Sequence, residues 1–330
     1  MVNFALLGAG RIGRMHADLI AANPAATLRY VYDINATAAT EVASKHQATS
    51  VTDVNEALAD SALDAVLIAS STDTHVDLII RAAKAGKAIL CEKPIDLDIN
   101  RVNRCWDEIK HCNVPIQLGF NRRYDPSHRA VAEAVRNGEV GQLEMVIISS
   151  RDPAPPPADY IKVSGGLLRD MMIHDFDLAR FVLGEEPVEV FAMASNKVDP
   201  MIGQLGDIDT AMVTLTTASG ILCHINNSRR AVYGYDQRLE AFGSLGMVRS
   251  NNQRATTLTR HTAEHSGSRD PLLHFFIERY QQAYQAEIND FIAAIAEQRT
   301  PTVSFEDGRR ALLLADAAYE SLRTGRKVAL

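Results

Sequence analysis

Short apolar runs alternate with amphipathic segments through the first third of the chain. The runs are apolar almost throughout, as in strands buried on both faces of a sheet, and they are Val2–Leu7, Thr27–Tyr32, Ala65–Ile68, Ala88–Cys91 and Pro115–Leu118. The segments between them repeat apolar residues at helical spacing, in Arg11–Ala22, Asn35–His46, Asp73–Ala85 and Ile99–His111. This alternation predicts a parallel, doubly wound sheet in an α/β domain over residues 1–120.

The pattern changes after about Phe120. A helix over Ser127–Asn137 is followed by longer runs that alternate apolar and polar residues, in Gln142–Ser150, Val188–Val198, Thr210–Thr217, Ile221–Asn227 and Arg238–Phe242. Such runs predict a large, mostly antiparallel sheet with helices on one face and the other face open. Helices over His274–Glu297 and Phe305–Arg323 close this second, α+β domain, which we expect to span residues 121–330. An open apolar face indicates oligomerisation through that face.

Composition narrows the class of protein. The 330 residues carry a formal net charge of −7 and are 46% hydrophobic, which disfavours a nucleic-acid partner. No stretch reaches the roughly 18 apolar residues of a membrane span. The four cysteines form no CxxC pair, so we expect free thiols. His261, His265 and His274 are spaced too loosely for a metal site, so we expect no metal and a charged loop in that region. We therefore expect a cytoplasmic protein.

A glycine motif stands where the first strand turns into the first helix. Gly8, Gly10 and Gly13, with Arg11 and Ile12 between them, form GxGxxG, the dinucleotide-binding signature of a Rossmann domain. Gly8 permits the tight turn, Gly10 lets the backbone approach a pyrophosphate at the helix N-terminus, and Gly13 allows close packing. The alternative is a glycine-rich turn without a ligand.

Asp33 ends the second strand, about twenty residues beyond the glycines. A carboxylate there accepts hydrogen bonds from the adenine ribose and repels a 2′-phosphate, so we expect NAD rather than NADP as cofactor.

Polar residues follow two further strands at the carboxyl edge, where open sheets bind ligands. Ser70, Ser71, Thr72 and His75 follow Ala65–Ile68, and we expect them to line the cofactor, although an ordinary helix histidine is an equal alternative for His75. Glu92-Lys93-Pro94 follows Ala88–Cys91, which places Lys93 towards the nicotinamide end of the crevice.

Asp170 and His174 are four residues apart, which would place them on one face of one helix. Oxidation of an alcohol requires loss of the hydroxyl proton, and a histidine oriented by a carboxylate suits that step near neutral pH. A surface Asp–His pair is the alternative. Asp175 and Asp177 would point elsewhere, and we expect them to be structural.

Several segments together resemble the glucose–fructose oxidoreductase/inositol dehydrogenase family, over nearly the whole chain. They are the Gly8–Gly13 motif, Cys91–Pro94, Gly119–Asp125, and Gly165-Gly166 leading to Asp170 and His174. Arg151–Pro156, Ile173–Asp177 and Tyr233–Arg238 are similar to the inositol dehydrogenase branch.

The resemblance implies roles for individual residues. Lys93 would hydrogen-bond the reacting oxygen, His174 would be the general base and Asp170 its partner and a substrate ligand, with Glu92 beside the cofactor. Arg123, Asp152 and Tyr235 would lie near a polyol substrate.

It also implies a reaction, which is NAD-dependent oxidation of myo-inositol at C2 to 2-keto-myo-inositol in a homotetramer. Two alternatives remain open at this point. One is another cyclitol or aldose substrate, such as scyllo-inositol or glucose, and the other is a non-enzymatic NAD-sensing protein.

Overall fold

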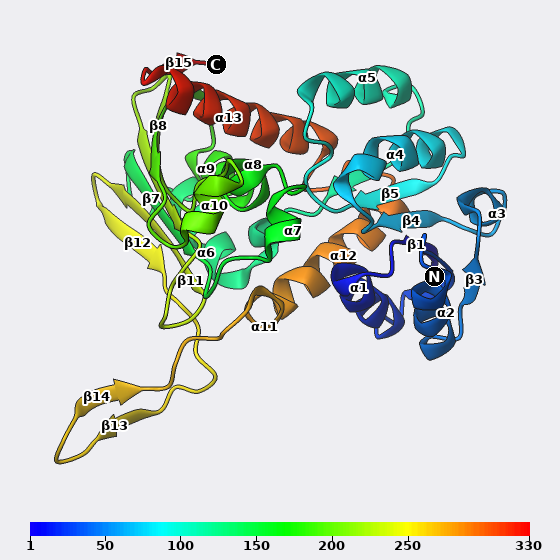
Figure 1. Cartoon of the computed structure of the whole chain (residues 1–330), viewed down its shortest axis with the longest axis horizontal. Helices are drawn as coiled ribbons and strands as arrows, with labels where there is room; N and C mark the ends of the chain where they lie inside the picture. The colour runs from blue at the N-terminus through cyan, green and yellow to red at the C-terminus, as the bar shows by residue number, and fades with distance from the viewer. The chain divides into compact units, whose positions relative to one another are not determined.

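A six-stranded parallel sheet organises the N-terminal part of the computed structural model, which describes residues 1–330 (Figure 1). Its strands are β1 (Val2–Leu7), β2 (Ala26–Tyr32), β3 (Thr49–Val51), β4 (Ala65–Ile68), β5 (Ala88–Cys91) and β6 (Ile116–Leu118), in the order β3-β2-β1-β4-β5-β6. The connecting helices are α1 (Arg11–Ala21), α2 (Ala36–Lys45), α3 (Val54–Leu58), α4 (His75–Lys84) and α5 (Ile99–Ile109). The predicted doubly wound Rossmann sheet is therefore confirmed.

The short β3–α3 segment is absent from the predicted elements. Three residues of strand and five of helix are too few for a periodic pattern to stand out. The α3 helix is instead defined by a capping box, in which the Asp53 side chain accepts from the Asn55 amide while Glu56 reaches back to the Asp53 amide.

The chain divides into two units, and the first comprises Met1–Asn121 together with Ala283–Leu312. The second unit comprises Arg122–Gln282 and Leu313–Leu330, so it is not the continuous 121–330 segment that we expected. The difference has a physical cause in helix α12 (Gln281–Glu297), whose Ile288 and Phe291 are fully buried in the core of the first sheet. The rings of Phe291 and Phe4, on β1, lie 6.0 Å apart between centroids.

A seven-stranded sheet organises the second unit, in the order β12-β11-β7-β10-β9-β8-β15. Its strands are β7 (Leu143–Arg151), β8 (Pro187–Ser195), β9 (Thr210–Thr217), β10 (Leu222–Ser228), β11 (Asp236–Gly243), β12 (Gly246–Ser250) and β15 (Val328–Ala329). Only the β7–β10 pair is parallel, so the predicted mostly antiparallel sheet is confirmed.

Helices cover one face of this sheet. They are α6 (Pro126–Arg136), α8 (Gly166–Asp170), α9 (Ile173–Leu183) and the second half of α13 (Phe305–Thr324). The unit also contains the short helices α7 (Ala158–Ile161), α10 (Pro200–Gln204) and α11 (Phe276–Arg279). Phe176 of α9 and Leu168 of α8 pack with Val146, Val213 and Ile225 of the sheet in one buried cluster. The alternation along the strands is thus explained by burial of every second side chain.

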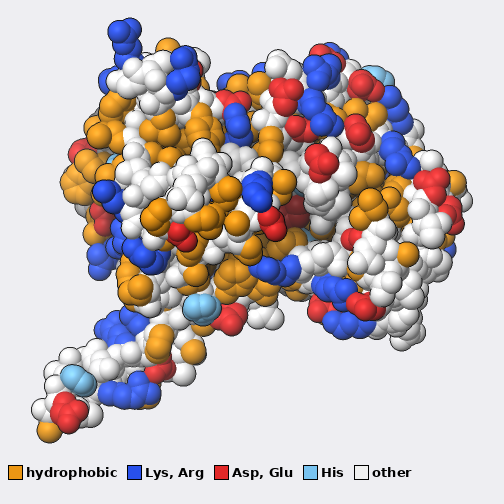
Figure 2. Space-filling view, viewed as in Figure 1, with side chains coloured by type: hydrophobic (Ala, Val, Ile, Leu, Met, Phe, Trp, Pro, Cys, Tyr) orange, Lys and Arg blue, Asp and Glu red, His pale blue; other side chains and the backbone are white.

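The other face of the sheet exposes a row of large apolar side chains. Leu222, Met145, Phe242 and Met247 are consecutive cross-strand neighbours on β10, β7, β11 and β12, and each is 40–45% exposed. Figure 2 shows apolar side chains at the surface of the second unit beside these strands. The expected open apolar face is present.

A hairpin extends from the second unit where the sequence led us to expect a charged loop. Its strands are β13 (Thr259–His261) and β14 (Ser266–Arg269), and it projects away from the large sheet (Figure 1). The Thr262 amide bonds to the His265 carbonyl over 2.8 Å and closes the turn. All four cysteines are free thiols, and no helix has the length and apolar character needed to cross a membrane.

Candidate active site

The glycine loop after β1 has the shape of a phosphate cradle. Gly8 has a φ of +109°, and a Cβ there would lie 2.5 Å from the Ala69 carbonyl carbon. A Cβ on Gly13 would lie 1.9 Å from the Gly8 oxygen. A Cβ on Gly10, in contrast, would meet nothing within 4 Å. Gly8 and Gly13 are therefore required by packing, whereas Gly10 faces space that a ligand can fill.

The first turn of α1 leaves this cradle suited to an anion. Arg11 and Ile12 begin the helix, and its N-cap Gly10 provides no side-chain acceptor for the helix amides. Unsatisfied N–H groups at a helix N-terminus attract a phosphate.

Asp33, at the end of β2, lies against the same loop. Its Oδ2 accepts from the Ala9 amide over 2.6 Å, and its Oδ1 accepts from the Asn35 amide over 2.7 Å. The carboxylate is thereby fixed beside the cradle, at the place where a dinucleotide presents its adenine ribose. The loop, the helix terminus and Asp33 together fit an NAD molecule.

The residues after β4 tie neighbouring loops together. Ser71 and Thr72 enter a 3₁₀ turn (η1, Thr72–Thr74), and the hydroxyls of Ser70 and Thr74 lie 2.7 Å apart. His75 is buried, with Nδ1 2.8 Å from the Pro94 carbonyl and Nε2 3.1 Å from the Ser70 carbonyl. Burial lowers the pKa of His75, and its hydrogen bonds to the two carbonyls oppose that change. This histidine supports the loops after β4 and β5, and its contact with a cofactor stays a prediction.

Glu92 and Lys93 follow β5 at the carboxyl edge of the sheet. Glu92 Oε1 lies 2.7 Å from Nε2 of His16, a buried residue of α1. Lys93 is partly exposed, and its bond to Pro94 is cis. The Glu92 carboxylate is thus anchored in the first unit, while its cofactor contact stays a prediction.

Asp170 and His174 do not share one helix, and that expectation is wrong. Asp170 is the last residue of α8, and His174 lies in the first turn of α9. The cap residue of α8, Met171, has φ −95° and ψ −56°, and α9 then begins at Ile173. Asp170 and His174 are therefore positioned by two different helices.

One buried arginine joins two of the predicted site carboxylates in the second unit. Arg229, which follows β10, donates from Nη2 to Asp170 Oδ2 over 3.1 Å, and its Nη1 lies 3.5 Å from Asp152 Oδ2. Tyr160 of α7 donates its hydroxyl to Asp170 Oδ1 over 2.8 Å. The Asp170 carboxylate is therefore oriented from two sides.

The pKa of the Asp152 carboxyl group is raised at this position. Burial raises the pKa of its carboxyl to about 6, with Arg229 opposing the change and Asp170 adding to it. A carboxyl with a pKa close to the working pH is typical of a functional site.

Two further arginines, Arg122 and Arg123, form buried ion pairs within the second unit. Arg122 is ion-paired with the fully buried Asp175, which also accepts from Asn227 Nδ2 over 2.9 Å. Arg123 donates twice to Asp177, over 2.8 and 2.6 Å. Asp175 and Asp177 are thus structural ion-pair partners, as expected.

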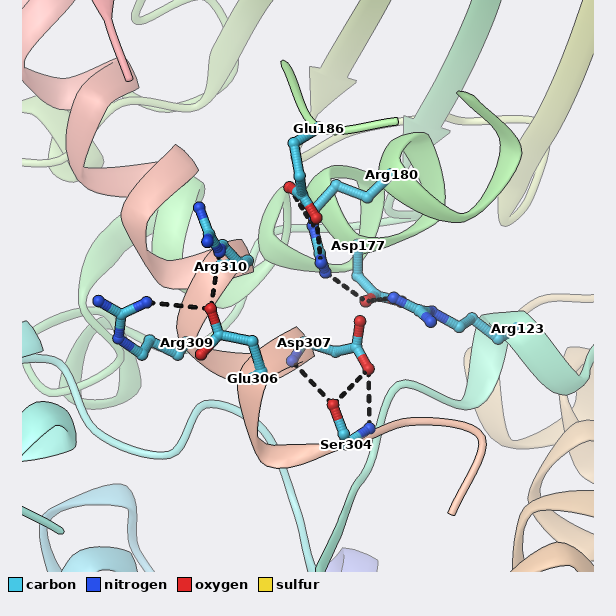
Figure 3. Close-up of polar contacts among 9 residues, drawn as sticks. All are labelled: Arg123, Asp177, Arg180, Glu186, Ser304, Glu306, Asp307, Arg309 and Arg310. Atoms are coloured by element: carbon cyan, nitrogen blue, oxygen red, sulfur yellow. Dashed lines mark hydrogen bonds and ion pairs between the residues drawn. The ribbon is translucent and has the colours of Figure 1, made fainter. Parts of the chain in front are cut away.

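The Arg123–Asp177 pair continues through Arg180 to Glu186, a chain of contacts visible in Figure 3. Arg123 therefore holds a structural position, and its role in substrate binding stays a prediction.

Tyr235 is buried beside a second tyrosine. Its ring meets that of Tyr280 edge-on, with 6.0 Å between centroids, and its amide donates to the Leu273 carbonyl over 3.1 Å. Burial raises the pKa of Tyr235 well above its ordinary value, so the phenol is neutral and can donate.

Arg229 and Tyr160 are absent from the sequence-based site. Arg229 could have been found from the sequence, because Arg229-Arg230 comes just after a predicted strand, where site residues are often located. Tyr160 lies in the one-turn helix α7, which follows a proline-rich loop, and nothing in its local sequence indicates a partner ten residues away.

Both halves of the chain match described families. Residues 2–120 match the oxidoreductase family with an NAD-binding Rossmann fold, and residues 128–249 match the GFO/IDH/MocA C-terminal domain.

Full-length relatives are similar throughout. The chain is 50% identical to inositol 2-dehydrogenase of Rhizobium meliloti, covering 100% of this chain and 99% of that protein. It is 46% identical to myo-inositol 2-dehydrogenase of Thermotoga maritima, covering 98% and 97%. The crystal structure of a myo-inositol dehydrogenase from Corynebacterium glutamicum superposes with a TM-score of 0.97 at 47% identity, covering 100% and 99%.

Proposed function

The chain belongs to the GFO/IDH/MocA oxidoreductase family, and from that premise we propose that it oxidises myo-inositol at C2 to 2-keto-myo-inositol. It is an NAD-dependent enzyme, and bound NAD⁺ supplies the acceptor for the hydride. The observation that carries the substrate assignment is the buried Arg229, which holds the Asp152 and Asp170 carboxylates in one place. Two oriented carboxylates accept hydrogen bonds from neighbouring hydroxyls, which a polyol presents in series.

The cofactor is assigned to the first unit. The open space at Gly10 and the first turn of α1, with Arg11 and Ile12, suit the pyrophosphate. Asp33 suits the ribose hydroxyls. Further contacts are proposed for five polar residues after β4 and β5, which are Ser70, Ser71, Thr72, His75 and Glu92.

The proton chemistry is assigned to three residues. His174 accepts the hydroxyl proton as the hydride leaves, because an imidazole titrates near neutral pH. Lys93 donates a hydrogen bond to the reacting oxygen and stabilises its developing negative charge. Asp170, oriented by Tyr160 and Arg229, accepts a substrate hydroxyl and supports His174.

Recognition of the remaining polyol hydroxyls is assigned to the second unit. Asp152 accepts and Tyr235 donates, while Arg123 contributes through its position beside Asp177. A site built to hydrogen-bond several hydroxyls rejects substrates that lack them.

We also propose a homotetramer that buries the apolar row Leu222–Met145–Phe242–Met247 between subunits. An exposed continuous row of this kind favours association over a free surface. Four free cysteines favour the reducing cytoplasm as the compartment.

A turnover assay tests the proposal directly. The protein is mixed with NAD⁺ and, separately, myo-inositol, scyllo-inositol or glucose, and the absorbance of reduced nicotinamide is followed. We expect myo-inositol to give the highest kcat/KM. Higher values for scyllo-inositol or glucose would reassign the substrate, and NAD⁺ binding without turnover on any polyol would favour an NAD-sensing protein.

A further inference from the structure

Three titratable side chains meet in the first unit beneath the loop that carries Lys93. His16 comes from α1, Glu92 from the end of β5 and Glu287 from the middle of α12, and their nitrogen and oxygen atoms lie within 4.8 Å of one another. His16 is 1% exposed and Glu287 is 0% exposed. Neither Glu287 oxygen has a hydrogen-bond partner, and neither does Nδ1 of His16.

With both carboxylates ionised, the cluster has more hydrogen-bond acceptors than donors. His16 Nε2–H donates to Glu92 Oε1 over 2.7 Å, which leaves His16 Nδ1 as an acceptor. Both Glu287 oxygens are acceptors as well if the residue is ionised. Two negative charges and an unpaired acceptor would then be buried together, at a large cost in free energy. One proton on Glu287 removes one of the two charges.

A metal ion is the other way to neutralise such a group, and the geometry disfavours it. Two tetrahedral zinc ligands, each about 2.0–2.2 Å from the ion, lie roughly 3.4 Å apart. The 2.7 Å separation of His16 and Glu92 has instead the length of a hydrogen bond.

We propose that Glu287 is a protonated carboxylic acid at neutral pH, and that it acts with His16 as a positioning residue for Glu92 and hence for Lys93. Gly119 completes the cage, because a Cβ there would lie 2.8 Å from Glu92 Oε2. Glu92 is therefore confined by α1, α12 and the end of β6, and the backbone of the next residue, Lys93, is fixed with it. The positioning role rests on the proposed function, whereas the protonation state does not.

Burial and the two charged neighbours of Glu287 favour its neutral form. Burial raises the pKa of Glu287 well above its ordinary 4.5, and the negative charges of Glu92 and of Asp290 on α12 raise it further. Gln117 of β6 donates only to the Glu287 main-chain oxygen, over 3.0 Å. Tyr284 of α12 packs edge-on against His16 and brings no charge.

The protonation state is tested without turnover, on the full chain. The infrared spectrum of wild type minus Glu287→Gln at pH 7 should contain the C=O stretch of a protonated carboxyl group. Glu297→Gln, on the same helix but exposed, is the matched control and should give only a carboxylate difference. A difference spectrum with only carboxylate bands for Glu287→Gln would overturn the proposal.

Stability provides a second measurement of the same proton. A raised folded-state pKa means that the contribution of Glu287 is fully present below about pH 4.5 and is lost as pH rises. The ratio of the unfolding constants of wild type and Glu287→Gln should therefore change by up to about tenfold per pH unit between pH 5 and 7. Parallel stability curves, or a rise in melting temperature when Zn²⁺ or Mn²⁺ is added, would contradict the assignment.

The positioning role is tested by kinetics on two variants. Glu287→Gln is uncharged and has nearly the same shape as the protonated acid, so its kcat should stay within about threefold of wild type. Glu287→Leu removes the polar head group from the cluster and should lower kcat roughly 10- to 100-fold. Wild-type kcat in Glu287→Leu would refute positioning. If no polyol is turned over by the wild type, the proposed function fails, while the infrared and stability results stand by themselves.

Discussion

The Arg229 guanidinium donates to the Asp170 carboxylate over 3.1 Å, and the arginine is 3% exposed. The same side chain lies 3.5 Å from Asp152. One guanidinium therefore offsets charge on both carboxylates.

Replacing this cation should damage both stability and turnover. Arg229→Met removes the guanidinium between the two carboxylates, so the free energy of unfolding should fall by about 3–5 kcal/mol, with a large loss of kcat/KM for the polyol. Arg229→Lys keeps the charge but not the forked geometry and should lose less. Urea unfolding and steady-state kinetics measure the two effects. Arg230→Met, whose guanidinium meets only main-chain carbonyls, is the neighbouring control. Equal behaviour of Arg229→Met and Arg230→Met would rule out this role.

Asp152→Asn should make the protein more stable and less active. The carboxyl pKa is raised from 3.8 to about 6, so its contribution to stability is present below pH 3.8 and is lost as pH rises through 6. At pH 7.5 the asparagine variant should gain up to about 3 kcal/mol in free energy of unfolding. Its KM for the polyol should rise, because an amide accepts hydroxyl protons less strongly than a carboxylate does. Equal stability of wild type and Asp152→Asn at both pH 5 and pH 7.5 would contradict the raised pKa.

Removal of the proposed proton acceptor should affect kcat far more than cofactor binding. His174→Ala and Lys93→Ala should each lower kcat by ~10²–10⁴-fold, while the Kd of NAD⁺ measured by fluorescence stays near the wild-type value. Asp170→Asn should also impair turnover. His261→Ala, on the exposed hairpin, serves as control. Wild-type turnover of His174→Ala would remove this residue from the chemistry.

Cofactor preference should depend on the charge of Asp33. Wild type should have a much higher kcat/KM with NAD⁺ than with NADP⁺, since the carboxylate repels a 2′-phosphate. Asp33→Ser should narrow the gap. Asp33→Asn keeps an oxygen that can accept from the Ala9 amide, so it separates the charge from support of the loop. Equal use of both cofactors by the wild type would refute the assignment.

The apolar row on the open sheet face should control assembly. Phe242→Glu places a charge between Met145 and Met247, its cross-strand neighbours, and should shift the tetramer to smaller species in light scattering at micromolar concentration. Ile34→Glu, at an exposed apolar residue of the first unit, should leave the mass unchanged. A wild-type protein that is monomeric under these conditions would exclude the tetramer.

The sequence alone determined the two sheets and the dinucleotide motif. Strand and helix periodicities are set by burial within a few residues, and the GxGxxG motif and the acidic residue about twenty positions later can be recognised by their spacing alone. The β1, β4, β5 and β9 boundaries agree with the predicted ranges for this reason.

Tertiary structure decided the relations between distant residues. Helix α12 packs on the first sheet because Ile288 and Phe291 fit into a core formed by residues far away in the sequence. The break between Asp170 and His174 is invisible in a spacing of four, because helical periodicity continues across a short irregular turn. Arg229 and Glu287 acquire their roles from partners 59 and 195 residues away, namely Asp170 and Glu92. Burial and charge compensation at such separations exist only once the chain has folded, and no local pattern carries them.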